Sequence, residues 1–291
     1  MLSSPSSPPS IRQLFFNHLT AWAMGFGIAT MALFVHQAFT PQTILLLFGI
    51  ALGYWLGFAL NDFYDAPFDA QQPSKAAGNY FIDNAFAQRL FARLLCIVVI
   101  MLVIIFAQFG LKGLGLLGLC FVVMWAYSAP PLRLKSRPVL DLLTHAIFVE
   151  AFPYWLCLIL IDAVWVDLDY IALTLAFLAS LTAQLEQQIR DYDLDRKTDT
   201  NFTTSVGVTT SVRLLAATTI LGLLILGGFI IVGTIPWYLA IAFFIVAPII
   251  WHRFRYRFRQ PPSQRVFTTC AILGLIYVGG LFIYVVVDRL S

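Results

Sequence analysis

The sequence predicts an all-α fold, a polytopic integral membrane bundle of helices. Of its 291 residues, 60% are hydrophobic and 11% are charged, and the mean hydropathy is +0.83. Soluble domains carry roughly 25% charged residues, so this composition fits a bilayer as the solvent. The apolar runs are about 20 residues long, which suits spanning helices, whereas barrel strands would be about ten residues of alternating polarity.

We predict about nine transmembrane helices, because nine apolar runs follow one another along the chain. Residues 1–13 begin Ser/Pro-rich and uncharged, which predicts a flexible N-terminal tail without a cleavable signal. Residues 14–291 are expected to form a single domain, since no polar linker exceeds about 25 residues. The predicted spans cover residues 14–39, 42–63, 90–108, 111–128, 139–161, 169–189, 212–232, 235–251 and 266–287.

Loop length and charge predict the orientation of these spans. The connections at Thr40-Pro41, Phe109-Gly110 and Gly233-Thr234 are tight, while those on the other side are longer and polar. With a cytoplasmic N-terminus, sixteen of the eighteen Lys and Arg residues face the cytoplasm, and only Lys112 and Arg289 lie outside. Positive residues favour the cytoplasmic side. We therefore expect a multi-pass protein of the cell (inner) membrane, with its N-terminus in the cytoplasm.

Seven of the fifteen acidic residues fall into two clusters, at the cytoplasmic ends of spans two and six. Within each cluster, carboxylates recur three or four residues apart and would share one helical face. Carboxylates crowded near a bilayer repel each other unless a cation intervenes. The clusters read Asn61-Asp62-Phe63-Tyr64-Asp65-Ala66-Pro67-Phe68-Asp69 and Asp191-Tyr192-Asp193-Leu194-Asp195-Arg196-Lys197-Thr198-Asp199.

Hard oxygen ligands suit Mg²⁺ or Ca²⁺, and Mg²⁺ commonly takes one or two carboxylates while phosphate oxygens and water complete its shell. Two facing clusters therefore predict two metal ions on one diphosphate. Solvated loops are the plain alternative for either cluster alone. An EF-hand matches Asp191, Asp193 and Asp195, but Arg196 stands where glycine is needed and Phe202 replaces the bidentate glutamate.

The clusters also indicate an internal repeat. They lie four spans apart, and basic residues follow spans four and eight, so pseudo-repeated four-helix units are expected. Pro67 lies inside the first cluster, and a proline removes a helical hydrogen bond. We expect the helix to end or kink near Asp65, with Asp69 on a short following helix.

Basic residues surround the same cytoplasmic face, where either positive-inside topology or an anionic ligand explains them. They are Lys75, Arg133, Lys135, Arg137, Arg190, Arg196 and Lys197. A further run, Arg253, Arg255, Arg257 and Arg259, is typical of lipid-headgroup anchoring. The four cysteines lie singly in apolar runs, which favours packing over a disulfide or zinc site.

These motifs resemble those of the UbiA superfamily of intramembrane prenyltransferases, across nearly the whole chain. Both aspartate clusters resemble the family's motifs, and Tyr127-Ser128-Ala129-Pro130-Pro131-Leu132-Arg133-Leu134-Lys135 is similar to its Y-S-x-P-P-x-R-L-K segment. The resemblance implies a Mg²⁺-dependent prenyltransferase that takes a prenyl diphosphate donor and a lipophilic acceptor among membrane lipid. It implies no nucleic-acid partner.

The resemblance also implies site residues. Those that would hold Mg²⁺ and the donor diphosphate are Asn61, Asp62, Asp65, Asp69, Asp191, Asp195 and Asp199. Candidates for contacting substrate are Tyr127, Arg133, Lys135 and Arg190, together with Lys75 beside the first cluster. The segment Gln71-Gln72-Pro73-Ser74-Lys75 departs from the arginine-proline segment of many quinone branches and looks more like lipid or carotenoid branches. The acceptor therefore stays open between an aromatic ring, an alkene and a hydroxyl.

For the chemistry, we expect the diphosphate to leave first, giving an allylic cation that aromatic faces can stabilise. The aromatic candidates are Phe63, Tyr64, Phe68, Trp125, Tyr127 and Tyr154, for each of which packing or interfacial anchoring is the better explanation. Asp141, His145 and Glu150 on span five are candidates for a base, and Glu150 is also a candidate acceptor contact. The rivals are a transporter that uses the aspartates as a cation site and a noncatalytic lipid-binding scaffold.

Overall fold

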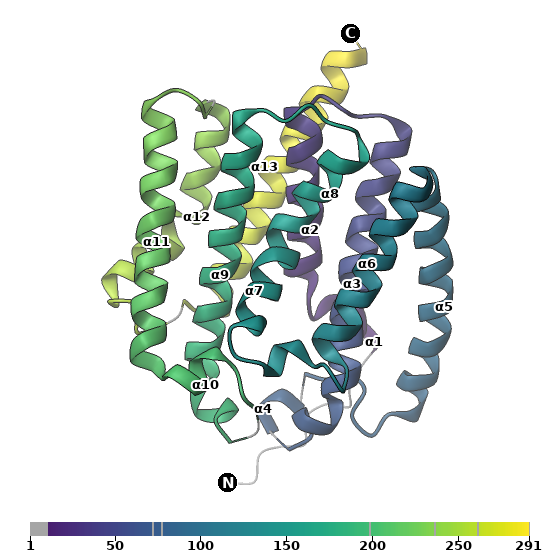
Figure 1. Cartoon of the computed structure of the whole chain (residues 1–291), viewed down its shortest axis with the longest axis vertical. Coiled ribbons are helices and arrows are strands. Elements are labelled where there is room, and N and C mark those ends of the chain that lie inside the picture. Colours follow the sequence, from purple (N-terminus) through teal and green to yellow (C-terminus); the bar gives the residue numbers. More distant parts are fainter. Residues whose placement is uncertain are drawn as a thin grey trace.

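The computed structural model describes residues 11–71, 73–76, 78–197, 199–235, 237–260 and 262–290, and this part of the chain contains helices and no β-strand. The all-α prediction is confirmed. The helices stand side by side as an upright bundle (Figure 1). Their order is α1 (Ile11–Phe16), α2 (Leu19–Val35), α3 (Pro41–Asp69), α4 (Pro73–Ala76), α5 (Ala85–Ala107), α6 (Gly110–Ser128), η1 (Leu134–Ser136), α7 (Leu140–Ala146), η2 (Ile147–Ala151), α8 (Phe152–Leu160), α9 (Asp167–Asp195), α10 (Phe202–Val206), α11 (Val208–Ile231), α12 (Trp237–Arg255) and α13 (Gln264–Leu290).

Seven helical stretches of the described chain are long and apolar enough to cross a membrane. They match the first seven predicted spans, the first of them formed by α1 and α2 together and the fifth by α7, η2 and α8. Helices α12 and α13 lie at the last two predicted spans but are not among the seven, so the count of nine stays a prediction. The predicted tail lies outside the described residues at 1–10, and its residues 11–13 belong to α1.

The two ends of the bundle differ in their connections. The short elements α4 and α10 lie together at one end, at the bottom of Figure 1, and we call this the polar end and the opposite one the far end. Helices α3 and α9 both finish at the polar end, and each is followed by a short helix and two longer ones. This order agrees with the predicted four-helix repeat. The last helix, α13, finishes at the far end (Figure 1).

Helix α3 begins at the far end with a capping box at Thr40, whose side chain accepts from the Thr43 amide, and with Pro41 in its first turn. It then runs without interruption to Asp69, so the expected break near Asp65 is wrong. Pro67 forfeits one backbone bond only one turn before the helix ends. The Asn79 side chain ties that turn together, donating to the Asp62 carbonyl at 2.8 Å and to the Asp69 carboxylate at 2.9 Å.

The fifth stretch is widened at its centre by the π-helical turn η2. The Phe152 amide bonds to the Ile147 carbonyl, five residues earlier, and Pro153 has no amide to offer Phe148 in the same pattern. The Tyr54 hydroxyl of α3 donates to the Phe148 carbonyl instead. A tertiary contact therefore satisfies a backbone group that lies at membrane depth.

Candidate functional site

A cavity of about 360 Å³ extends from the polar end into the bundle, between α3, α6, α7 and α9. On α3 its lining runs from Asp65 to Gly49, roughly 24 Å at the helical rise per residue. At the polar end it is lined by Asn61, Asp65, Lys75, Lys135, Asp195 and Asp199. Its deep part is lined by apolar side chains, among them Ile50, Leu102, Phe106, Leu117, Phe121 and Leu156. The cavity thus has a charged end and an oily end.

Shared cations join the two aspartate clusters at the charged end. Lys75 follows the first cluster, and its Nζ lies 2.9 Å from Asp195 Oδ1 of the second. Arg133 Nη2 lies 3.1 Å from Asp65 Oδ1 and 3.6 Å from Asp199 Oδ2. Burial by itself would lower the pKa of Lys75. The hydrogen bond to Asp195 and the charge of that carboxylate outweigh burial and raise the pKa above its ordinary value. The topology predicted that both clusters face the same side, and the structure places them there.

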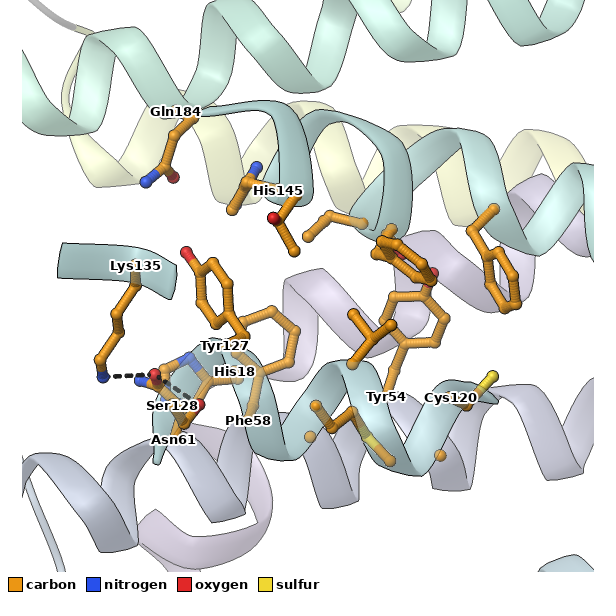
Figure 2. Close-up of a pocket in the computed structure, with 18 of the residues that line it drawn as sticks. His18, Tyr54, Phe58, Asn61, Cys120, Tyr127, Ser128, Lys135, His145 and Gln184 are labelled. Carbon is orange, nitrogen blue, oxygen red and sulfur yellow. Dashed lines mark hydrogen bonds between the residues drawn. The ribbon is translucent and has the colours of Figure 1, made fainter. Parts of the chain in front are cut away.

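Asn61 and Asp65 of α3 line this end of the cavity, and Figure 2 shows Asn61 beside Lys135 and Ser128. Asn61 Oδ1 accepts from Lys135 Nζ at 2.7 Å and from Ser128 Oγ at 3.3 Å, and its Nδ2 donates to Asp65 Oδ2 at 3.1 Å. Lys135 also pairs with Asp65. Burial lowers the pKa of Lys135 from its ordinary value, against the opposing effect of the Asp65 carboxylate.

Arg133 lies behind this wall and does not line the cavity. Its backbone is left-handed, with φ of 36°, a conformation that costs free energy in residues other than glycine. The guanidinium stacks 3.9 Å from the Phe68 ring centroid, and Nε donates to Ser136 Oγ at 2.8 Å. Together with its two carboxylate partners, these contacts make Arg133 a brace between the clusters.

Several predicted site residues lie off the cavity lining. Asp62 faces His18, whose Nε2 is 3.0 Å from both carboxylate oxygens. Asp69 is held by Asn79, and Asp191 pairs with the adjacent Arg190 at 3.2 Å. Glu150 is buried in η2. Of the seven predicted metal-position residues, Asn61, Asp65, Asp195 and Asp199 line the cavity, whereas Asp62, Asp69 and Asp191 face other partners.

Sequence reasoning missed three residues at this end. His18 lines the cavity, stacks on Phe58 and pairs with Asp62, and Asn79 holds the end of α3. Asn201 caps α10 and donates to Asp195 Oδ2 at 3.1 Å. Only Asn201 carried a local signal, as an N-cap residue followed three positions later by Thr204. The partners of His18 and Asn79 depend on how separate helices pack.

Arg253 differs from the lipid-facing role predicted for its run. It is buried, with Nε 2.8 Å from Glu186 Oε1 and Nη2 3.0 Å from Glu186 Oε2. Its Nη1 donates to Thr219 at 3.3 Å. The remaining three arginines of the run are exposed. Lipid anchoring is therefore wrong for Arg253, because Glu186 of α9 neutralises its charge inside the bundle.

The charged end offers oxygen ligands of the kind that hard cations prefer. Those that line the cavity are Asn61, Asp65, Asp195 and Asp199. Within the described residues, no three His, Cys, Asp or Glu side chains are grouped closely enough to hold a metal by themselves. Such a site suits a cation that completes its coordination shell with water and ligand oxygens, as Mg²⁺ does.

Solved structures show the same fold. A UbiA homologue from Archaeoglobus fulgidus bound to DMAPP and Mg²⁺ matches with a TM-score of 0.71 at 17% identity, over 92% of this chain and 98% of that chain. The GPP- and Mg²⁺-bound form matches with a TM-score of 0.67 at 18% identity, over 93% and 99%. The apo structure of a UbiA homologue from Aeropyrum pernix K1 matches with a TM-score of 0.67 at 15% identity, over 92% and 98%.

Comparison with curated proteins gives no match. The model of the UbiA prenyltransferase family, however, matches residues 20–286, which is most of the chain. Together with the seven membrane-length helices, this makes the protein an integral, multi-pass membrane enzyme. The chain belongs to the UbiA prenyltransferase family.

Proposed function

We propose that this protein transfers an isoprenyl group from an allylic prenyl diphosphate to a lipophilic acceptor inside the membrane, in a Mg²⁺-dependent reaction. The observation that carries the proposal is the cavity, which joins a cluster of carboxylates and lysines to an apolar interior. A prenyl diphosphate has the same two parts, a highly charged head and a hydrocarbon tail. DMAPP and GPP, which the Archaeoglobus fulgidus homologue binds with Mg²⁺, are of this class.

At the charged end, we assign the head of the donor to Lys75 and Lys135, each of which already holds a carboxylate lining the cavity. Asn61, Asp65, Asp195 and Asp199 would hold Mg²⁺, two ions in our proposal, with diphosphate oxygens completing the shells. Bound Mg²⁺ supplies positive charge that stabilises the leaving diphosphate. Arg133 keeps Asp65 and Asp199 in place from behind.

At the oily end, the tail would lie along α3 against Ile50, Leu102 and Phe106. This lining offers an isoprenoid chain apolar contact and excludes water from the allylic carbon, so that the cation is not quenched. Tyr54 and Phe58 line the cavity between the two ends, where their rings can stabilise positive charge. The acceptor would approach the same carbon.

The site would face the cytoplasm, with the protein in the cell (inner) membrane. The charge distribution of the loops supports this orientation, since sixteen of eighteen basic residues lie on that side. The rival transporter hypothesis has weaker support, because the aspartates lie at helix ends and the family is one of prenyltransferases.

The test is turnover of radiolabelled geranylgeranyl diphosphate by purified protein in nanodiscs, with a total membrane lipid extract as the acceptor source. We expect labelled lipid product and diphosphate release with Mg²⁺ and neither with EDTA. Asp65→Asn should lower turnover roughly 100-fold or more, because charge stabilisation of the leaving group is lost.

Asp193→Asn is the matched control. Asp193 belongs to the second cluster, but its side chain is 86% exposed and pairs with Arg196 at 3.3 Å, away from the cavity lining. It should keep wild-type turnover. Turnover that is insensitive to EDTA, or equal in Asp65→Asn and Asp193→Asn, would contradict the proposed site.

A further inference from the structure

The middle of the cavity, between its charged and oily ends, carries polar side chains that the donor does not need. Tyr127, His145 and Gln184 line it, from α6, α7 and α9 respectively. In Figure 2 the Tyr127 hydroxyl points across the cavity toward the side that carries His145 and Gln184. In the same view Tyr127 and His145 lie further into the bundle than Lys135, and Gln184 lies across the cavity from Asn61 (Figure 2).

Gln184 is the most informative of the three. Gln184 is only 9% exposed, and it lines the cavity. Within the described part of the chain, no hydrogen bond holds its side-chain amide, whereas Gln188, one turn later, donates to Asp141 and accepts from Thr203. The amide atoms of Gln184 keep access to the cavity. An amide that loses this access without gaining a partner is costly, so Gln184 favours a ligand with a hydrogen-bonding group.

His145 has one ring nitrogen without a partner among the described residues. The Ser180 hydroxyl donates a hydrogen bond to the His145 carbonyl at 3.1 Å. The Ser180 oxygen is therefore the acceptor for Nδ1–H of His145 at 3.2 Å. The second ring nitrogen, Nε2, is then unprotonated, and it has no partner among the described residues. His145 is half-buried, and it lines the cavity.

The other two candidate bases on span five, Asp141 and Glu150, do not line the cavity. Asp141 is fully buried, where its Oδ2 accepts from Gln188 at 2.6 Å and from the Phe202 amide at 2.8 Å, and it does not line the cavity. Glu150 is buried in η2 and does not line it either. His145 is therefore the base that an acceptor in the cavity can reach.

The charge of this region limits the acceptor further. Lys75 and Lys135 are the described lysines and arginines that line the cavity, and each is paired with an aspartate at the charged end. A carboxylate on the acceptor would thus meet only neutral groups in the middle of the cavity, which is unfavourable at low dielectric. A pure hydrocarbon would leave Gln184 unsatisfied.

We infer that the acceptor is a lipophilic molecule with an uncharged hydroxyl, that Gln184 holds this hydroxyl, and that His145 Nε2 takes its proton. This rests on the proposed function. The acceptor oxygen forms a bond to C1 of the donor, the C1–O bond to diphosphate breaks with its electron pair going to diphosphate, and the hydroxyl proton moves to Nε2. No oxidant or further reactant is needed.

The first experiment separates donor binding from transfer. Binding of a non-reactive thiolo-analogue of geranylgeranyl diphosphate with Mg²⁺ is measured first, and its absence in the wild type would mean that the proposed function itself fails. With binding intact, His145→Gln should lower the transfer rate roughly 100-fold or more and Gln184→Leu roughly tenfold, while analogue affinity stays at the wild-type value. Gln88→Leu, an exposed glutamine on α5, should change neither.

The second experiment compares three defined acceptors in nanodiscs: a long-chain primary alcohol, a polyene hydrocarbon and a long-chain alkyl hydroxybenzoic acid with a free carboxylate. We expect transfer to the alcohol and neither of the others. Preference for the polyene or the acid, or no transfer to the alcohol while the donor analogue binds, contradicts the inference. It is also contradicted if His145→Gln weakens analogue binding as much as it slows transfer, since His145 would then have only a structural role.

Discussion

The two ends of helix α9 use aspartate in different ways. At the far end, Asp169 is fully buried, and its oxygens are held by His36 Nε2 at 3.0 Å, the Tyr154 hydroxyl at 2.8 Å and the Val166 amide at 2.8 Å. At the polar end, Asp195 is held by Lys75 at 2.9 Å and Asn201 at 3.1 Å, and its side chain is 13% exposed on the cavity.

Asp169 and Asp195 differ in whether a ligand can replace their hydrogen-bond partners. Those of Asp169 form a closed shell, since they come from the connection before α9 and from two packed helices, and no ligand can reach it. Those of Asp195 include a lysine at the cavity surface, which can turn to an incoming anion while the carboxylate turns to a metal ion. We therefore expect Asp169 to serve folding and Asp195 to serve turnover, and the predictions below test this division.

The largest effect is expected for Asp195→Asn. Loss of one carboxylate at the charged end should lower turnover of the labelled donor roughly 100- to 1,000-fold. The amide oxygen still accepts from Lys75, and the lost contact with Asn201 lies on the cavity lining, where water can replace it, so the thermal unfolding midpoint in detergent should change little. Turnover and the midpoint are measured on the same preparation, and a fall in both would mean that Asp195 is as structural as Asp169.

The next largest effect is expected at the middle of α9, for Glu186→Gln. This change leaves the Arg253 guanidinium buried without a counter-charge, which costs about 3–5 kcal/mol in the free energy of unfolding. The double variant Glu186→Met with Arg253→Met removes both charges and should recover most of that loss. If the single variant is as stable as the wild type, the Arg253 charge is compensated elsewhere.

Asp169→Asn should have a smaller effect on stability and little effect on the reaction. The asparagine amide must face at least one of the three donors, so about 1–3 kcal/mol of unfolding free energy is lost, while turnover per folded molecule stays at the wild-type value. Asp167→Asn, an exposed change in the same first turn, controls for the interaction with the helix dipole. Reduced turnover of folded Asp169→Asn would remove the proposed division between the ends.

This comparison also shows what could be predicted from the sequence. The spacing of Asn61 with Asp65, and of Asp195 with Asp199, placed each pair on one helical face, and the loop charges placed both faces at one end. Periodicity does not identify the neighbouring helix, however. Asp62 and Asp69 follow the same spacing but face His18 and Asn79, so their position off the cavity was not predictable.

Two errors of the sequence prediction have the same physical origin. Arg253 looked like its exposed neighbours because its partner, Glu186, is 67 residues away. Pro67 predicted a helix end from local sterics alone, whereas Asn79 supplies the contact that keeps the last turn of α3 in place. In both cases a tertiary contact outweighs a local preference. Of the polar groups at the middle of the cavity, Tyr127 and His145 were among the candidates from the sequence, but Gln184 was missed because a glutamine in a helix carries no motif.

The smallest effect is expected for Lys112→Ala at the far end. Lys112 Nζ lies 2.6 Å from Asp162 Oδ1, closer than Lys75 Nζ lies to Asp195 at 2.9 Å, but the Asp162 side chain is 85% exposed. Exposed ion pairs are screened by water and contribute within about 1 kcal/mol, so unfolding and turnover should match the wild type. A loss as large as that of Asp169→Asn would mean that burial is not what separates structural from dispensable charges here. If the wild-type protein is equally stable at low and high salt, water already screens the Lys112–Asp162 pair and the pair contributes nothing measurable. Burial is then the property that distinguishes Asp169 from Asp162.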